Sequence, residues 1–260
     1  MLSTGLNIEM LRHKLTGRLV GSRLHYHQVL GSTMDEAHSL AQLESPEGTV
    51  VVAEEQTAGR GRFNRAWVSP PGQNLALSVL LRPGSDQLRY VNMAATLAVS
   101  GAIIELTGLR PSIKWPNDVR INGRKVSGIL IETTVEGGEL SYAVVGIGLD
   151  VNFDPSQTPG LADIATSLYL ETGRPLDRTA VMLAVLERLD DLYAAVKRGC
   201  SLTDRWAAQL DTIGRTVKVR WGDRLMEGRA RGVDEQGNLL LAQPDGSTVT
   251  VVAGEVTLQE

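Results

Sequence analysis

The sequence predicts an α+β fold, in which a mixed, largely antiparallel sheet with packed helices is followed by a small β-barrel. Helical and strand-like patterns are interleaved along the first part of the chain, and several neighbouring strands are joined by turns too short to hold a crossover helix. After residue 212 the pattern changes to closely spaced strands alone. We therefore expect two domains, residues 1–212 and residues 213–260.

The first expected helix begins at Ser32 or Thr33 and ends near Leu43. Either hydroxyl can accept a hydrogen bond from the free amides of the first helical turn. Two strands rich in aliphatic side chains follow, at residues 49–53 and 74–81. A long irregular segment separates them, and such a segment inside a compact domain is usually functional or disordered.

A second helix is expected from its capping residue Asp86 to Thr107, because Gly108 and Pro111 then end it. The remaining elements follow from the same kinds of signal. They are a hairpin turn at Asn122-Gly123, strands at residues 119–121, 125–131 and 140–147, a helix at residues 178–197 capped by Asp177, a short helix at residues 202–210, and strands at residues 216–221, 228–233, 238–242 and 248–251.

The charge balance argues against a protein that binds polyanions. The chain has 26 basic and 30 acidic residues, and its formal net charge of -4 gives no general attraction for nucleic acid or anionic lipid. The single cysteine, Cys200, excludes an internal disulfide and a cysteine-rich zinc module. We see no signal peptide and no apolar stretch long enough to span a membrane. We expect a cytoplasmic protein that binds neither nucleic acid nor a membrane.

The arginine loop (residues 59–67) holds the densest group of functional side chains. It reads Gly-Arg-Gly-Arg-Phe-Asn-Arg-Ala-Trp, so two glycines allow a close approach to a ligand and three arginines offer donors for phosphate or carboxylate. A solvated basic loop is the plainer interpretation. The buried strands on either side and the acidic overall charge favour instead a loop that closes over an anionic ligand.

Two further segments add polar groups. Lys114 precedes a Trp-Pro-Asn-Asp turn, which makes it a second cation for an anionic site, although such a lysine is more often merely exposed. Gly146-Ile147-Gly148 ends a strand but lacks the third glycine of a dinucleotide-binding fingerprint. Because we find no metal-binding set, nucleophile elbow or P-loop, the sequence indicates positioning and charge stabilisation rather than covalent catalysis.

Taken together, these segments resemble the biotin protein ligases. The resemblance rests on the order and spacing of Ser32-Thr33, residues 56–62 with Arg65 and Trp67, residues 114–118, residues 125–130 and Gly146-Ile147-Gly148. It implies the synthetase-like fold of biotin and lipoate ligases, followed by an SH3-like barrel. It also implies two reactions: ATP activates biotin to biotinyl-5'-adenylate with release of pyrophosphate, and a lysine of a biotin carboxyl carrier domain then accepts the biotin.

The resemblance implies roles for the matched residues. The catalytic groups would be Lys114, Arg62 and Arg65, with Lys114 beside the reacting carboxylate and α-phosphate. Biotin would contact Ser32, Thr33, Met34, Gln56, Arg60, Gly61, Arg62, Lys114 and Gly128. ATP or the adenylate would contact Arg60, Arg62, Arg65, Trp67, Asn117, Lys125, Gly148 and Asp150. Mg²⁺ would arrive with the ATP phosphates, without a dedicated set of carboxylates.

Three positions depart from the family pattern. Met34 and Asp150 stand where the family often has Asn, and Asn64 stands where it often has Gly. The change at Asp150 matters chemically, because an ionised carboxylate accepts from the exocyclic amine of adenine but does not donate to a ring nitrogen. The few residues before position 22 are too short for the DNA-binding domain of some members, so we expect the form that lacks it.

Two other functions stay open at this point. A lipoate or octanoate transferase would share Lys114 but not the pairing of Gly-Arg-Gly-Arg with Lys-Trp-Pro-Asn-Asp. A noncatalytic sensor would bind biotin or a nucleotide without releasing pyrophosphate. We expect a monomer or a weak homodimer.

Overall fold

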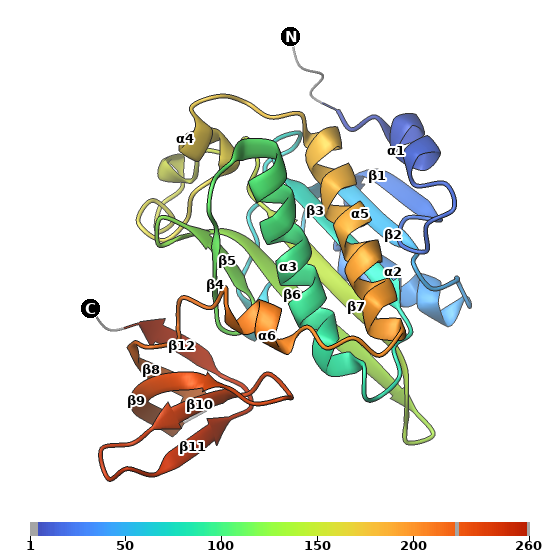
Figure 1. Cartoon of the computed structure of the whole chain (residues 1–260). Helices are drawn as coiled ribbons and strands as arrows, with labels where there is room; N and C mark the ends of the chain where they lie inside the picture. Colours follow the sequence, from blue (N-terminus) through green and yellow to red (C-terminus); the bar gives the residue numbers. More distant parts are fainter. Residues whose placement is uncertain (1–4, 222–223, 259–260) are drawn as a thin grey trace.

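Helices and strands are interleaved along the first part of the chain, whereas the elements described after residue 212 are all strands (Figure 1). The computed structural model describes residues 5–221 and 224–258. The longer elements of the first part are α1 (Ile8–Lys14), β1 (Leu24–Leu30), α2 (Thr33–Gln42), β2 (Val50–Gln56), β3 (Leu75–Leu81), α3 (Leu88–Thr107), β4 (Ser112–Lys114), β5 (Asp118–Ile121), β6 (Arg124–Glu136), β7 (Glu139–Leu149), α4 (Leu168–Thr172), α5 (Arg178–Lys197) and α6 (Thr203–Ala207). Those of the second are β8 (Thr216–Trp221), β9 (Arg224–Val233), β10 (Leu239–Ala242), β11 (Thr248–Val251) and β12 (Glu255–Leu258).

The strands form two sheets, one for each part of the chain. The first has seven strands in the order β1-β2-β3-β7-β6-β5-β4, in which β1 and β2 are parallel and the other neighbours antiparallel. The second has five antiparallel strands in the order β11-β10-β9-β8-β12. The predicted α+β class, with its mixed and largely antiparallel first sheet, is confirmed.

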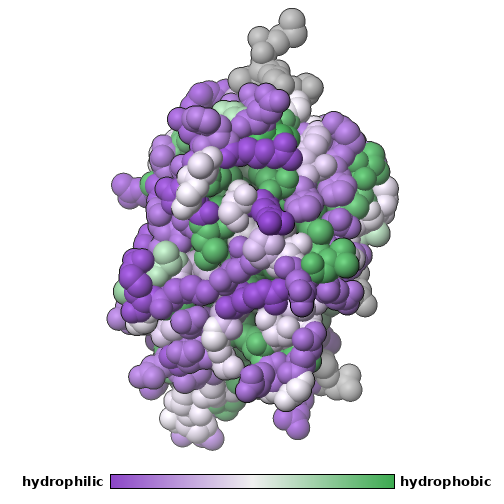
Figure 2. All heavy atoms as spheres, turned by 90° about the vertical axis from the view of Figure 1, so that its right-hand side faces the viewer, coloured by the Kyte–Doolittle hydropathy of each residue, from purple (hydrophilic) through white to green (hydrophobic). Residues whose placement is uncertain are grey.

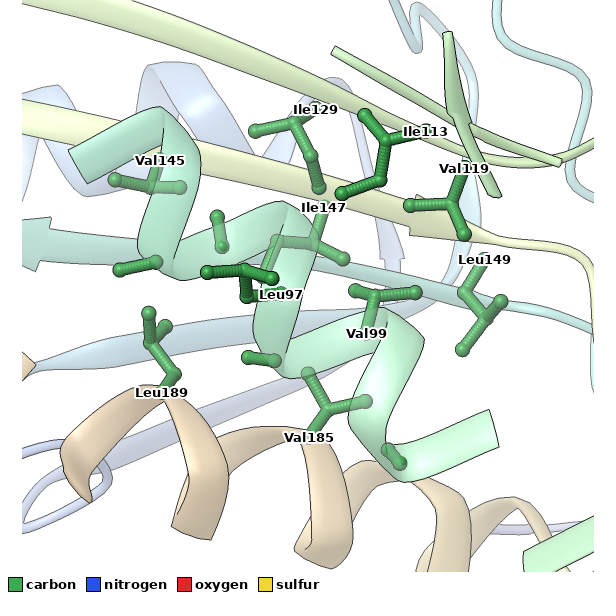
Figure 3. Packing of buried hydrophobic residues seen from close by; sticks show 14 of the residues in the cluster. Leu97, Val99, Ile113, Val119, Ile129, Val145, Ile147, Leu149, Val185 and Leu189 are labelled. Atoms are coloured by element: carbon green, nitrogen blue, oxygen red, sulfur yellow. The ribbon is translucent and has the colours of Figure 1, made fainter. Parts of the chain in front are cut away.

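The seven-stranded sheet is covered on both faces, which explains why its central strands are buried throughout (Figure 1). The helices α3 and α5 cover one face, where Leu97 of α3 packs between Val185 of α5 and Ile147 of β7 (Figure 3). The helix α2 packs on the opposite face, against Leu80 and Val144. Because side chains alternate along a strand, odd-numbered residues of β3 face α3 and even-numbered residues face α2.

Several local predictions are confirmed and one is wrong. Ser32 caps α2, and the turn at Asn122 and Gly123 has φ of 49° and 81°, as a two-residue hairpin of this kind requires. Asp86 does not cap α3, because the helix begins at Leu88 and its N-cap residue is Gln87. The side chain of Gln87 makes no capping hydrogen bond. The sequence patterns also did not indicate α1, β1, α4 or β12.

The helix α3 meets the length and composition criterion for a membrane span, contrary to the expectation that no stretch would. In the structure it is a core helix, since 61% of its most apolar window is buried and it packs against α5 and the sheet. Its apolar character therefore reflects contacts on several sides. The face of the molecule seen in Figure 2 is mainly hydrophilic, with small and separate apolar areas.

Candidate active site

A cavity of about 480 Å³ lies on the α2 side of the seven-stranded sheet and collects the whole predicted site. Its floor is formed by two cross-strand residue pairs of β7 and β6. Gly146 of β7 lies opposite Leu130 of β6, and Gly148 lies opposite Gly128. Every residue predicted to bind biotin or ATP lines this cavity: Ser32, Thr33, Met34, Gln56, Arg60, Gly61, Arg62, Arg65, Trp67, Lys114, Asn117, Lys125, Gly128, Gly148 and Asp150.

The two glycines of β7 leave room for side chains that lie on the floor. A Cβ atom at Gly146 would stand 2.6 Å from Sδ of Met34, and one at Gly148 would overlap the indole ring of Trp67. Since real Cβ atoms do not approach other atoms so closely, both positions need glycine unless a neighbour moves. The Gly-Ile-Gly segment is therefore part of a cavity floor and not a dinucleotide-binding turn.

The α2 end of the cavity (Ser32, Thr33, Gln56, Arg60 and Ser78) has fixed hydrogen-bond partners. The amide and the hydroxyl of Thr33 both donate to Oε1 of Gln56, at 2.8 and 3.0 Å, and the hydroxyl of Ser78 donates to Thr33 at 2.8 Å. The Ser32 hydroxyl accepts from the first turn of α2. Thr33 and Ser78 are buried, so these bonds set which atoms are presented to a ligand.

Arg60 reaches the cavity, but its charge is paired within the chain. Nε and Nη2 each donate to a carboxylate oxygen of Glu132 at 3.2 Å, and Nη1 lies 2.7 Å from Oδ1 of Asp35. The sequence patterns missed both carboxylates. Strand alternation could have found Glu132, because it shares the α2 face of β6 with Gly128 and Leu130.

The other two arginines of the loop reach the second domain. Arg62 donates to Oδ1 of Asn117 at 3.0 Å and to the carbonyl oxygen of Gly254 at 3.1 Å. Arg65 forms an ion pair of 2.6 Å with Glu255. Gly254 and Glu255 line the cavity, so the second domain forms part of its wall, which the sequence patterns did not indicate.

Lys114 stands at the end of β4, paired through its backbone with β5, and its ammonium forms no hydrogen bond or ion pair with any residue that the structure describes. Its side chain is half-buried, and burial lowers the pKa of its ammonium group, against the opposing effect of the Asp118 carboxylate. A partly desolvated and unpaired cation gains more from an arriving anion than one already held by a carboxylate. This lysine is the group best placed to receive an anion.

Lys125 and Trp67 form the wall beside Lys114. The ammonium of Lys125 is paired with Asp118 at 2.6 Å and lies 5.6 Å from the centre of the Trp67 ring. The indole Nε1 is buried and finds no acceptor among the described residues. A buried indole N–H without a partner is unfavourable, so this ring is suited to a polar ligand that brings an acceptor.

Asp150 lies at the buried inner side of the cavity. Its Oδ1 accepts a hydrogen bond of 2.7 Å from Asn74, whose own amide oxygen accepts from the backbone of Val151. Burial raises the pKa of the Asp150 carboxyl well above its usual range, although nearby Lys125 opposes this. This shift favours the protonated form, which carries an O–H donor that an ionised carboxylate lacks.

The part of the chain that the structure describes holds no group of three His, Cys, Asp or Glu side chains that could bind a metal ion. Glu255 and Asp118, which line the cavity, are each paired with a cation. Among the cations of the cavity, Arg60, Arg65 and Lys125 are thus paired with carboxylates, and the Lys114 ammonium is left to meet an anion.

Comparisons with known proteins agree with the fold and the cavity. The profile of the Biotin/lipoate A/B protein ligase family matches residues 26–150, and that of the Biotin protein ligase C terminal domain matches residues 212–258. The bifunctional ligase/repressor BirA of Bacillus subtilis is 38% identical over 241 residues, which cover 91% of this chain and 74% of that protein. The biotin–[acetyl-CoA-carboxylase] ligase of Paracoccus denitrificans is 35% identical over 231 residues, or 79% of this chain and 88% of that protein.

A solved structure supports the same assignment. The biotin protein ligase from Aquifex aeolicus in complex with biotin and ATP superposes with a TM-score of 0.78 at 31% identity, covering 91% of this chain and 98% of that one. The fold and the two profiles define a ligase of the biotin and lipoate class. The chain belongs to the biotin protein ligase family.

Proposed function

We propose that this chain is a biotin–[acetyl-CoA-carboxylase] ligase that forms biotinyl-5'-adenylate and then transfers biotin to a lysine of a biotin carboxyl carrier domain. The observation that carries the proposal is the unpaired, half-buried ammonium of Lys114 in a cavity lined by every residue that the family pattern assigns to the ligands. The names of its relatives in Paracoccus denitrificans and Mycobacterium tuberculosis describe the same activity.

Lys114 would act on the first reaction by charge. In that reaction a carboxylate oxygen of biotin forms a bond to the α-phosphorus of ATP, the bond between the α- and β-phosphates breaks, and pyrophosphate leaves. Both reactants are anions, so a cation between them reduces their repulsion and stabilises the charge that develops at phosphorus. Arg62 and Arg65 hold the loop over this region through their contacts with the second domain.

The two ends of the cavity suit the two ligands differently. At the α2 end, Thr33 and Gln56 have fixed orientations, as recognition of the polar head of biotin requires. At the other end, the indole of Trp67 offers a flat surface for adenine. A neutral Asp150 can both donate to a ring nitrogen and accept from an exocyclic amine, as the asparagine usual in the family would.

The remaining parts of the proposal concern conditions and partners. Mg²⁺ enters on the triphosphate, since the described residues supply no carboxylate set for it. The acceptor is a carrier domain of a carboxylase, and we propose a cytoplasmic monomer or weak homodimer that binds neither nucleic acid nor a membrane. The net charge of -4 supports the last point.

Transfer of labelled biotin tests the function. Purified protein, ATP, MgCl₂ and a biotin carboxyl carrier domain should give labelled carrier and one pyrophosphate per biotin, and a carrier with its acceptor lysine changed to arginine should stay unlabelled. Chelation of Mg²⁺ should stop the reaction. Transfer of lipoate but not biotin would identify a lipoate ligase, and biotin binding without pyrophosphate release would identify a sensor.

A further inference from the structure

A chain of buried polar contacts leads from the core of the first domain to Asp150. Arg178 of α5 forms an ion pair of 2.7 Å with Glu54 of β2, and both side chains are buried. Nη1 of the same arginine donates to the backbone carbonyl oxygen of Asn74 at 2.9 Å. Asn74 directly precedes β3 and, in the register of β3 with β7, lies opposite Asp150. A helix as well as the sheet therefore fixes the backbone at Asn74.

The side-chain amide of Asn74 has one orientation that satisfies its neighbours. Its Oδ1 accepts from the backbone N–H of Val151 at 3.0 Å, and its Nδ2 donates to Oδ1 of Asp150 at 2.7 Å. A backbone N–H only donates, so the amide oxygen has to face Val151 and the NH₂ group has to face Asp150. Asn74 is only 1% exposed, so solvent does not compete for either contact. Oδ1 of Asp150 is therefore held as an acceptor.

The other oxygen of Asp150, Oδ2, has no hydrogen-bond partner among the described residues. Asp150 lines the cavity and is only 5% exposed, so Oδ2 is the polar atom left to meet a ligand. The nearby cation, Lys125, is paired with Asp118 at 2.6 Å. A buried carboxylate that is bonded to one neutral amide and has no cation of its own is costly, which favours the protonated acid. Because Oδ1 already accepts from Asn74, the proton of that acid belongs on Oδ2.

We propose that Asn74 is a positioning residue, which holds Oδ1 of Asp150 as an acceptor and so leaves Oδ2 as the hydrogen donor that faces the base of the nucleotide. Adenine has ring nitrogens that accept, so a donor at this position matches it, whereas an atom that only accepts would repel them. Asn74 would impose the same polarity on an amide at position 150, since an amide also accepts at one end and donates at the other. The inference rests on the proposed function in taking this base to be the adenine of ATP.

The double variant Asn74→Asp, Asp150→Asn tests the proposal against Asp150→Asn alone, a background in which position 150 does not titrate. The new carboxylate at position 74 accepts where Asn74 donated, so the amide at position 150 turns its NH₂ group inward and its oxygen toward the base. We expect the KM for ATP to be about tenfold higher in the double variant than in Asp150→Asn, as the loss of one hydrogen bond implies. The KM for biotin should change by less than about twofold. Initial-rate kinetics measure both.

Asn152→Asp in the same background is the matched control. Asn152 follows the same strand, exchanges two hydrogen bonds with the backbone of Leu176 and lies outside the cavity. The change removes a hydrogen bond of the same kind and should lower the melting temperature to a similar extent, while the KM for ATP stays within about twofold of the background. Equal rises in the KM for ATP in the two double variants would assign Asn74 to general stability and overturn the proposal.

Infrared spectroscopy tests the wild type without any change at Asn74. The difference spectrum between the wild type and Asp150→Asn in neutral buffer should contain the C=O band of a protonated carboxyl. This band should shift when α,β-methylene-ATP is added, because the O–H then donates to the base. Absence of the band, or a band that the analogue leaves unchanged, would overturn the proposal.

Calorimetry with the same analogue measures the contact without any transfer of biotin, because the link between its α- and β-phosphates does not break. Its dissociation constant should rise about tenfold from Asp150→Asn to the double variant with Asn74→Asp. An unchanged dissociation constant would show that Asn74 does not set the polarity at position 150. If the wild type fails to transfer biotin but the dissociation constant rises as expected, the proposed function is refuted and the positioning role of Asn74 stands.

Discussion

The two ends of the cavity differ in how far the protein satisfies its own polar groups. At the α2 end, Thr33 is bonded to both Gln56 and Ser78, and Arg60 is paired with two carboxylates. At the Lys114 end (Lys114, Lys125, Trp67 and Asp150), the ammonium of Lys114 and the indole N–H of Trp67 have no partner among the described residues, although Lys125 is paired with Asp118. These ends lie over two glycines of β7, Gly146 and Gly148, which are two residues apart on one face of the strand, so the contrast arises within a single small cavity.

The comparison indicates that the α2 end fixes the geometry of a ligand, whereas the Lys114 end stabilises its charge. A network whose members are all satisfied holds one geometry and loses little when a ligand arrives, which suits recognition of an uncharged polar head group. Groups left unpaired at a partly dry site interact strongly with an incoming charge, which suits the phosphate reaction. The following changes test this division, from the largest expected effect to the smallest.

Lys114→Ala removes the unpaired cation and should have the largest effect. We expect adenylate formation to slow by about 10²–10³-fold, the usual cost of removing one group that stabilises developing charge. The free energy of unfolding should change by less than about 0.5 kcal/mol, because the ammonium has no partner to lose. Rapid-quench measurement of adenylate and urea denaturation check the two expectations.

A lysine on α1, Lys14, supplies the control for that variant, since it is exposed and lies outside the cavity. Lys14→Ala should leave adenylate formation unchanged. Lys114→Arg should recover only part of the rate, because a planar guanidinium does not replace a compact ammonium. Near-normal adenylate formation in Lys114→Ala would contradict the proposal that the Lys114 ammonium stabilises charge in the first reaction.

Alanine at each floor glycine compares the two ends directly. At Gly148 the new methyl group overlaps the rigid indole of Trp67, whereas at Gly146 it meets the flexible end of Met34. We expect Gly148→Ala to lower the free energy of unfolding by about 2–3 kcal/mol and Gly146→Ala by less than about 1 kcal/mol. Urea denaturation of both variants measures these free energies. Equal losses of stability would show that Trp67 moves as easily as Met34.

Thr33→Val tests the satisfied end with a nearly isosteric change. The variant keeps the backbone donor to Gln56 but deprives the buried Ser78 hydroxyl of its acceptor. We expect the KM for biotin to rise about tenfold and the KM for ATP to change by less than about twofold. Initial-rate kinetics with each substrate varied in turn provide the measurement. A matching rise in the KM for ATP would contradict the separation of the two ends.

The sequence was informative about the residues of the site because their signals are local. Glycines that permit close approach, arginines in one loop and a lysine before a turn are visible as patterns, and the structure collects them all in one cavity. The fold class was likewise visible, since short turns between strands require antiparallel pairing. The strand β1 was not, because an edge strand with three polar side chains lacks a clear alternation.

Local sequence patterns did not predict contacts between residues that are far apart in the sequence. The contact of Arg60 with Glu132 spans 72 residues, and that of Arg65 with Glu255 spans 190. Whether an arginine faces a ligand or one of the chain's own carboxylates depends on the topology of the sheet and the packing of the second domain. For this reason the sequence suggested three arginines facing an anion, whereas the structure shows three attachments of the loop.

Asp150→Asn should give the smallest effect on activity, and the pH dependence of its stability carries the information. Burial raises the pKa of this carboxyl in the folded protein, with Lys125 opposing, so the folded state binds the proton more tightly than the unfolded state, whose pKa is about 3.9. The wild type therefore loses stability as the pH rises through the folded pKa. Asparagine does not titrate and avoids this loss.

The stabilities of the two proteins should accordingly diverge with pH. Well below the unfolded pKa of about 3.9, the difference between Asp150→Asn and the wild type contains no contribution from ionisation. Above it the variant should gain stability over the wild type by up to about 1.4 kcal/mol per pH unit, for as long as Asp150 keeps its proton in the folded state. Urea denaturation from pH 3 to pH 8 measures the curve. A difference that stays constant with pH would mean that Asp150 is ionised throughout, in which case it could not donate to adenine, and the nucleotide contact at the Lys114 end would rest on Trp67 alone.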